Sequence, residues 1–190
     1  GIDNSPCLNK EGIHRLINCF DKNGNRISWA CYGLDNKPCI TKESNAHKGV
    51  YKYNEQGNLL ETAYYNVEGK PCLNNNGVHL VSNKYNEKGN KIECASYNTE
   101  GRLCYDKDGA PIWTYKHDSQ GNCIEIAYWG IDSQPCYGYN GYAKVVNTYD
   151  SRGNKIEWAY FDPDGNPCWD EKGIHREINS YDDKGNRTEW

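Results

Sequence analysis

Along the chain, short runs of aromatic and β-branched residues alternate with short polar runs that end in glycine. In the run "KIEWAYF" at Lys155–Phe161 successive side chains belong to opposite faces of an extended segment. The two faces are Ile156, Trp158 and Tyr160, and Glu157, Ala159 and Phe161. No stretch repeats its apolar residues with the period of a helix. The pattern predicts short β-strands joined by turns, with no helix longer than a turn.

Polar turns come in sets of three along the chain. From Tyr149 onward these turns are Asp150–Gly153, Asp162–Gly165 and Asp170–Gly173. Asp or Asn at the first place can bond the backbone two residues on, and glycine at the fourth can adopt positive φ. This is the pattern of a type I turn with a G1 bulge, which reverses the chain in a hairpin. The segments between the turns are Asn154–Phe161, Asn166–Trp169 and Ile174–Tyr181.

The element Y-[DN]-x-x-G-N recurs along the whole chain and defines a repeat. Its copies begin at Phe20, Tyr53, Tyr85, His117, Tyr149 and Tyr181, so the period is 33 at the first step and 32 thereafter. Their turn glycines are Gly24, Gly57, Gly89, Gly121, Gly153 and Gly185. The one extra residue falls in Thr41–Gly49. We expect residues 1–190 to form a single array with partial units at both ends, as in a segment of a longer array.

The repeat predicts the fold class. We expect an all-β fold, an elongated array of antiparallel β-hairpins with about six 32-residue units. A hairpin alone is only marginally stable, so stacked copies must cover one another. Turns that reverse the chain favour hairpins over the alternative, a parallel β-solenoid with one repeat per coil.

The composition narrows the function classes. Mean hydropathy is -0.99, hydrophobic residues make up 36%, and 16 residues are tyrosine. Sheets covered by tyrosine rings suit this composition better than a deep apolar core. A net charge of -4 gives no basic surface for nucleic acid. No apolar stretch is long enough to insert into a membrane as a helix.

At "YDSRGN" (Tyr149–Asn154) and "YDDKGN" (Tyr181–Asn186) the chain resembles the YD, or RHS, repeats of large bacterial proteins. Compared with that family, the period here is longer, and the repeat carries an additional Pro-Cys turn, with Leu103 in place of proline in one unit. The resemblance implies a β-rich scaffold from a bacterial surface, secreted or toxin-related protein, with adjacent repeats of a parent chain as neighbours. It implies no catalytic residues.

Ten cysteines make the chain cysteine-rich, and no C-x-x-C motif is present. Six cysteines follow the repeat: Cys7, Cys39, Cys72, Cys104, Cys136 and Cys168. The others are Cys19, Cys31, Cys94 and Cys123. Equivalent cysteines separated by two or three strands lie about 10–14 Å apart, beyond the roughly 7 Å that a disulfide spans. We expect the six repeating cysteines to be small buried side chains. The alternative is a disulfide between a repeating and an irregular cysteine, Cys31–Cys39 or Cys94–Cys104.

The recurring polar residues could be taken for metal ligands or catalytic groups. His14, His47, His79 and His175 share one repeat place, and equivalent places do not converge on one metal ion. Asp106 and Asp162 begin sequences similar to a calcium loop, but its twelfth place holds His117 and Gly173 instead of glutamate. One glutamate recurs in each unit, at Glu61, Glu93, Glu125, Glu157 and Glu189, whereas a glycosidase needs one pair. We expect no enzyme, metal or cofactor.

Aromatic residues are the candidates for binding. Trp29, Trp158 and Trp190 share one repeat place, and the other candidates are Trp113, Trp129, Trp169, Tyr137, Tyr139 and Tyr142. Exposed rings stack on sugars or anchor protein partners, but the same rings could form the core of a thin sheet. The favoured function is a non-catalytic scaffold or protein-interaction segment. The alternative is a carbohydrate- or cell-wall-binding array that uses its aromatic rows.

Overall fold

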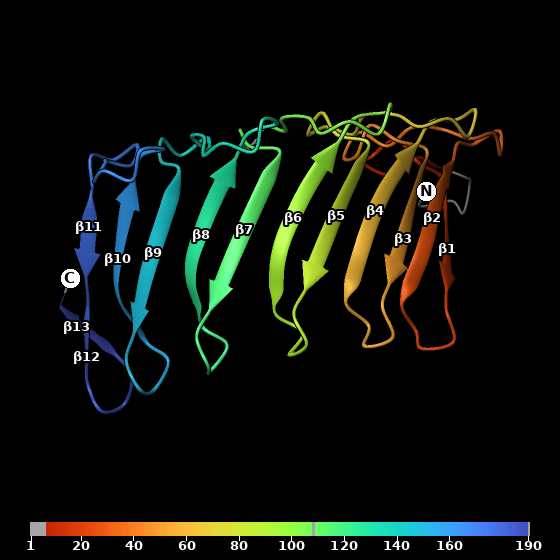
Figure 1. The fold of residues 1–190 in the computed structure, drawn as a ribbon. Coiled ribbons are helices and arrows are strands. Elements are labelled where there is room, and N and C mark those ends of the chain that lie inside the picture. The colour runs from red at the N-terminus through yellow and green to blue at the C-terminus, as the bar shows by residue number, and fades with distance from the viewer. Residues whose placement is uncertain (1–6, 108, 190) are drawn as a thin grey trace. The chain divides into compact units, whose positions relative to one another are not determined.

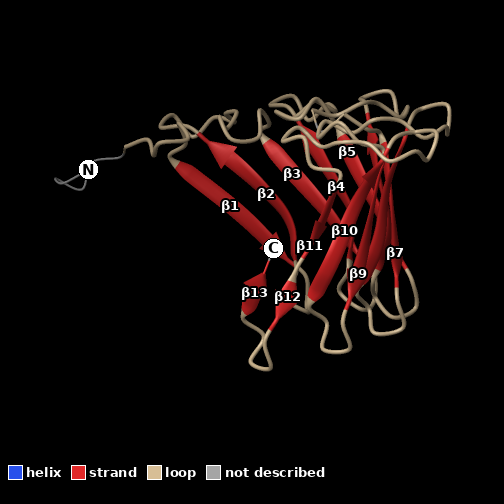
Figure 2. Cartoon of the chain, turned by 90° about the vertical axis from the view of Figure 1, so that its left-hand side faces the viewer, coloured by secondary structure: helices blue, strands red, loops and turns tan. Residues whose placement is uncertain are grey.

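The computed structural model describes residues 7–107 and 109–189. It contains strands, turns and loops, and no helix among the described residues (Figure 2). The chain divides into two compact units, Gly1–Asn83 with Ser96–Cys104, and Lys84–Ala95 with Tyr105–Trp190. The prediction of a single array over residues 1–190 stays a prediction.

The first unit contains two hairpins. Its strands are β1 (Arg15–Phe20), β2 (Arg26–Tyr32), β3 (Lys48–Tyr53) and β4 (Leu59–Tyr65). β1 pairs with β2 and β3 pairs with β4, while β2 also pairs with β3. Residues Leu80–Ser82 of β5 (Leu80–Tyr85) pair with β4. β6 is Lys91–Tyr97, and β5 and β6 contribute residues to both units.

The second unit repeats this arrangement. Its strands are β7 (Ile112–His117), β8 (Cys123–Trp129), β9 (Lys144–Tyr149), β10 (Lys155–Phe161), β11 (Arg176–Ile178), β12 (Ser180–Tyr181) and β13 (Arg187–Glu189). The hairpins are β7–β8, β9–β10 and β12–β13, and the remaining pairs are β6–β7, β8–β9 and β10–β11. Within each unit, hairpin turns lie at one end of the strands and the longer connections at the other (Figure 1).

Every strand pair that the structure describes is antiparallel. The predicted all-β fold of antiparallel hairpins is therefore confirmed, and the parallel β-solenoid is excluded. Each four-residue segment after the second turn forms only an isolated bridge, such as Phe161 with Pro167. The long segments are thus strands, and the short ones are single contacts that hold the connections against the sheet.

The hairpin turns have the geometry of a type I turn with a G1 bulge. In the turn from Asp150, the Gly153 N–H donates to the Asp150 carbonyl at 3.0 Å, and Gly153 has a φ of +82°. The register then shifts between Lys155 and Glu157, as a bulge requires. The six turn glycines, Gly24 to Gly185, have φ between +81° and +91°. Glycine is needed there because other residues rarely adopt this conformation.

Candidate functional site: a polar cavity and exposed loop aromatics

A cavity of about 330 Å³ lies in the first unit, between the sheet and its connecting loops. Strands β2, β3 and β4 line it through Arg26, Trp29, Tyr51 and Tyr64. The loops contribute Glu11, Thr41, Glu43, Ser44 and Asn74–Asn76, among others. Its volume is at the lower end of the range for small-molecule sites. Aromatic rings, carboxamides and charges of both signs therefore surround one space.

The cavity is built where the repeat is broken. Trp29 on β2 pairs with Gly49 on β3, and a Cβ at Gly49 would overlap the indole nitrogen. The equivalent pairs in the described array all carry side chains on both strands: Thr62–Val81, Cys94–Trp113, Ile126–Val145 and Trp158–Glu177. Gly49 thus leaves the space that the Trp29 indole occupies against the neighbouring strand. Trp29 is 7% exposed and packs with Ile13, Cys31 and Ala46.

The Tyr51 hydroxyl is held by two donors at this cavity. It accepts hydrogen bonds from Trp29 Nε1 at 2.8 Å and from Arg26 Nη2 at 3.0 Å. A phenol oxygen has two acceptor positions and one hydrogen. With both positions filled, the Tyr51 hydrogen is left for a third group. The Arg26 guanidinium also lies over the Tyr51 ring, 5.2 Å from its centre.

The loop with the extra residue covers the cavity in an ordered conformation. Thr41 Oγ1 and Ser44 Oγ lie 2.6 Å apart, and Ala46 is fully buried. From the next repeat, Asn75 Nδ2 donates to the carbonyls of Lys42 and Glu43, each at 2.7 Å. The longer repeat step marked this loop in the sequence. Nothing in the sequence showed that Trp29, Tyr51 and Arg26 would meet beneath it, so the cavity was missed.

The six tryptophans differ in environment. Trp29 is buried and Trp169 is 67% exposed, whereas Trp113, Trp129 and Trp158 are half-buried. Trp129 Nε1 donates to Thr114 Oγ1 at 2.8 Å, and Lys155 lies over the Trp158 ring. Trp190 lies outside the described residues. The repeat place shared by Trp29 and Trp158 thus forms no exposed row in the described chain.

The three candidate tyrosines also divide into two kinds. Tyr142 stacks on Tyr160 with ring centres 4.4 Å apart, and its other neighbour is Tyr128 at 5.7 Å. Tyr128 in turn meets Trp113 edge-on at 4.8 Å, so these four rings form a packed column in the second unit. Tyr137 and Tyr139 are 54% and 60% exposed. With Trp169, they are the exposed aromatics among the predicted binding residues whose side chains the structure describes.

The loops that carry the exposed aromatics of the second unit are in close contact with neighbouring loops. A Cβ at Gly109 would lie 2.9 Å from the Tyr139 nitrogen, and one at Gly141 would lie 3.9 Å from the Trp169 carbonyl oxygen. The loops that follow β6, β8 and β10 are therefore stacked side by side. Tyr139 and Trp169 project from adjacent members of this stack.

The carboxylate and amide side chains in the turns form hydrogen bonds with the backbone. In eleven of the turns that the structure describes, one Asp or Asn oxygen accepts the backbone N–H groups two and four residues on. At Asp118 the second oxygen also accepts from Asn122 Nδ2 at 2.9 Å. The Asn122 amide and the turn N–H groups lower the pKa of Asp118 below its ordinary value. The carboxylate form is therefore the one that fits the turn.

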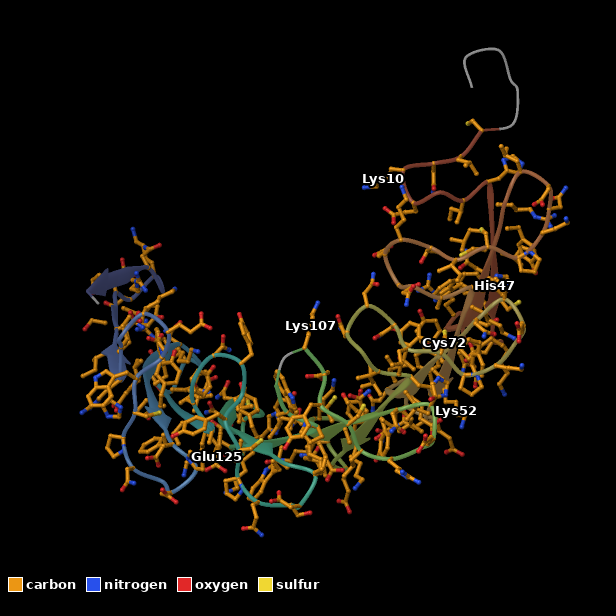
Figure 3. All side chains as sticks on the ribbon, turned by 90° about the horizontal axis from the view of Figure 1, so that it is seen from above. Lys10, His47, Lys52, Cys72, Lys107 and Glu125 are labelled. Carbon is orange, nitrogen blue, oxygen red and sulfur yellow. The ribbon has the colours of Figure 1, made fainter. Side chains whose placement is uncertain are left out.

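Four of the five recurring glutamates form ion pairs across the sheet. Lys52 pairs with Glu61 at 2.6 Å, Lys84 with Glu93 at 2.8 Å, and Lys116 with Glu125 at 2.9 Å. Arg176 pairs with Glu157 at 2.7 Å. Lys52 and Glu125 are labelled in Figure 3. The side chain of Glu189 lies outside the described part. Each paired glutamate shares its strand face with the recurring alanine two residues on, as the two-residue period predicts.

The recurring histidines support the connections. His47, labelled in Figure 3, is 8% exposed, and its Nδ1 lies 3.2 Å from the Cys39 carbonyl oxygen. His14, His79 and His175 make the same kind of contact at 2.8–3.1 Å. A carbonyl oxygen only accepts, so Nδ1 carries the hydrogen. Among the described residues, no group of three or more His, Cys, Asp or Glu side chains is placed to hold a metal ion.

No disulfide joins any of the cysteines among the described residues. Cys7 and Cys19 are exposed, Cys31 is fully buried, and the others are half-buried. The expectation that the six repeating cysteines are buried is therefore wrong, because those after Cys7 lie in the short segments that meet the sheet through a single bridge. Burial raises the pKa of the Cys31 thiol to about 11, with a smaller contribution from Cys39. No described residue lies in a helix long and apolar enough to cross a membrane.

The described structure is thus an array of antiparallel β-hairpin repeats. No protein-family model matches this chain, and no curated protein matches it. The crystal structure of TcdB2-TccC3-TEV is similar at 13% identity and a TM-score of 0.45, over 90% of this chain and 10% of that chain. Those of TcdB2-TccC3 and of TcdB2-TccC3 without its hypervariable C-terminal region are similar at 15% identity, with TM-scores of 0.41 and 0.40. Each of these two similarities extends over 91% of this chain and 9% of the other chain.

Proposed function

We propose that this chain is a non-catalytic repeat scaffold and protein-interaction segment of a larger bacterial surface, secreted or toxin-related protein. The proposal rests on one observation: the recurring polar side chains bind other groups of the repeat array itself. Turn Asp and Asn oxygens bond backbone N–H groups, and four recurring glutamates are held by Lys or Arg. Groups committed to each unit's own structure are not arranged as one catalytic constellation.

The loop aromatics of the second unit are the part of the scaffold suited to a partner. Tyr137, Tyr139 and Trp169 are more than half exposed and lie on neighbouring loops. Large aromatic side chains at the centre of an interface supply much of its binding energy. The hairpin stack holds these loops at fixed spacing, which reduces the entropy cost of binding.

Deletion of one whole repeat tests the scaffold. Removing Asp118–Tyr149 takes out one full period and joins His117 to Asp150, which restores the Asp-Ser-Arg-Gly turn. We expect a folded β protein with a cooperative urea transition, because each repeat contacts mainly its neighbours. Circular dichroism and urea titration measure this. The full chain should not turn over chromogenic glycosides, and turnover abolished by Glu157→Gln would contradict the non-catalytic role.

The matched control removes Ser119–Tyr149 instead, which keeps Asp118 and leaves one extra residue in the turn. A one-residue shift moves a strand's side chains to the opposite face. We expect this variant to lose most of its cooperative transition. The chain is not a modular scaffold if the two deletion variants show the same urea transition. The same conclusion follows if the variant that lacks one full period is unfolded.

The cavity in the first unit favours a second candidate function, recognition of a carbohydrate. Tyr51 lines the space with a hydroxyl that already accepts two hydrogen bonds, and Glu11 and Glu43 line it with no ion-pair partner among the described residues. Sugar hydroxyls both donate and accept, so they complement such a mixed lining. This candidate uses a cavity instead of exposed aromatic rows.

Tyr51→Phe tests the carbohydrate candidate, because it removes the donor and keeps the ring. With an oligosaccharide that binds the wild-type chain in isothermal titration calorimetry, we expect affinity to fall about 5- to 15-fold, the value of one hydrogen bond. Tyr115→Phe is the control, since Tyr115 holds the same repeat place in β7. Failure of cello-, chito- and malto-oligosaccharides to bind at millimolar concentration, or equal effects of the two variants, would remove this candidate.

A further inference from the structure

Cys31 and Cys39 face each other across a tight reversal of the chain. Tyr32 forms an antiparallel bridge with Pro38, and Cys39 N–H donates to the Cys31 carbonyl at 3.1 Å. On the other side of the bridge, Gly33 N–H donates to the Lys37 carbonyl at 2.9 Å. The next pair outward from the bridge is therefore Cys31 with Cys39.

This pairing brings the two cysteines within disulfide range. Cys39 N–H donates to the Cys31 carbonyl, whereas Cys31 N–H donates to the His47 carbonyl, so one hydrogen bond joins the two cysteines directly. Directly opposite residues of antiparallel strands have side chains on the same face and Cα atoms about 4.5–5.5 Å apart. Disulfides form at Cα separations of about 4.4–6.8 Å. Both side chains also belong to one apolar cluster, in which Cys31 is fully buried and Cys39 packs against it.

Among the described residues, no other unit places two cysteines this way. Each repeating cysteine after Cys39 also donates its N–H to the carbonyl of the residue opposite. Those opposite residues are Tyr64, Ser96, Tyr128 and Tyr160. In the described units, Cys31 is thus the exception among these opposite residues, because it is a cysteine that meets a repeating cysteine. The other candidate pair, Cys94–Cys104, does not have this geometry, because the residue opposite Cys104 is Ser96.

We propose that Cys31 and Cys39 form an intramolecular disulfide when the protein meets a small-molecule disulfide such as oxidised glutathione. The Cys39 thiolate attacks one glutathione sulfur, forming a mixed disulfide and releasing a glutathione thiolate. The Cys31 thiolate then attacks Cys39 Sγ, breaks the mixed disulfide and releases a second glutathione thiolate. Two protein thiols are oxidised, one glutathione disulfide is reduced to two thiols, and the thiol protons pass through water to the leaving thiolates.

The order of the two steps follows from exposure. Cys39 is half-buried and reachable by glutathione, whereas Cys31 has no exposed surface. The second step needs the Cys31 thiolate, whose pKa of about 11 keeps it scarce at neutral pH. Ring closure should therefore accelerate as pH rises from 7 to 9. The product closes a nine-residue loop beside the Trp29 cluster and suits an oxidising compartment.

The experiment incubates the full chain with oxidised glutathione and maps its peptides without reduction. Trypsin should release Ile27–Lys42 two mass units lighter, because Lys37 precedes proline and is not cut. Cleavage before Asp35 should then leave the two halves joined until a reductant is added. We also expect a rise in Tm on oxidation, since the bond restricts the unfolded chain.

Matched variants make the result decisive. Cys31→Ser and Cys39→Ser should each abolish the crosslink, whereas Cys94→Ser should leave it unchanged. Ser96→Cys places a second pair opposite Cys104 and should add a 96–104 crosslink. Oxidation that joins Cys39 to Cys72, a neighbour in the same cluster, would overturn the proposal. So would folded wild-type chain that keeps both thiols or stops at glutathione mixed disulfides.

Discussion

Replacing Trp29 with alanine should lower the free energy of unfolding by about 3–5 kcal/mol. The side chain is 7% exposed, packs against Ile13, Cys31 and Ala46, and donates its Nε1 hydrogen to Tyr51. Alanine leaves a cavity in this cluster and removes a donor from the Tyr51 oxygen. Urea titration followed by circular dichroism measures the loss, and amide hydrogen exchange should locate it in β1–β4.

Trp169→Ala is the control for this prediction. Trp169 is 67% exposed on a loop of the second unit, so its removal should change the free energy of unfolding by less than about 0.5 kcal/mol. A loss below about 1 kcal/mol at Trp29 would mean that the cluster is not a core. If Trp169→Ala costs as much as Trp29→Ala, the division between packed and exposed aromatics is wrong.

The hairpins could be predicted from the sequence because their determinants are local. Asp150 and Gly153 are three residues apart and fix both the turn and the register of β9 against β10. The same spacing in each repeat then fixes which side chains share a face. The conformation of the Asn166–Trp169 segment is harder to predict, because four residues between two turns can make only one bridge, here at Pro167.

The cavity could not be predicted, because it depends on register between hairpins. The pairing of Trp29 with Gly49 is set by the connection between β2 and β3, which includes the loop with the extra residue. No turn rule gives the conformation of that connection. The sequence marked the loop as irregular but could not bring Arg26 and Tyr51 together beneath it. For Cys31 and Cys39, closeness in sequence left the pairing open, and the Tyr32–Pro38 bridge provides the geometry.

Gly49→Ala should destabilise the chain by about 1–3 kcal/mol, the typical cost of overpacking. A loss of stability is unusual for replacing a glycine of this kind with alanine. Gly49 does not have positive φ, and where alanine fits, this substitution stabilises a protein by about 0.4–1 kcal/mol through the unfolded chain. At Gly49 the new Cβ would meet the Trp29 indole, with Cε2 only 2.6 Å away. Thermal and urea unfolding of the single variant measure the cost.

The Trp29→Val background shows whether the indole is the cause. Valine is β-branched, like Thr62 and Ile126 at the same repeat place, and leaves room beside residue 49. There, Gly49→Ala should be neutral or stabilising, so that the double-mutant cycle gives a coupling above about 1 kcal/mol. Gly33→Ala, also at a residue without positive φ, controls for the general effect of glycine replacement. Equal destabilisation by Gly49→Ala in both backgrounds would show that the strain comes from the backbone, and the indole would no longer explain why this strand carries glycine.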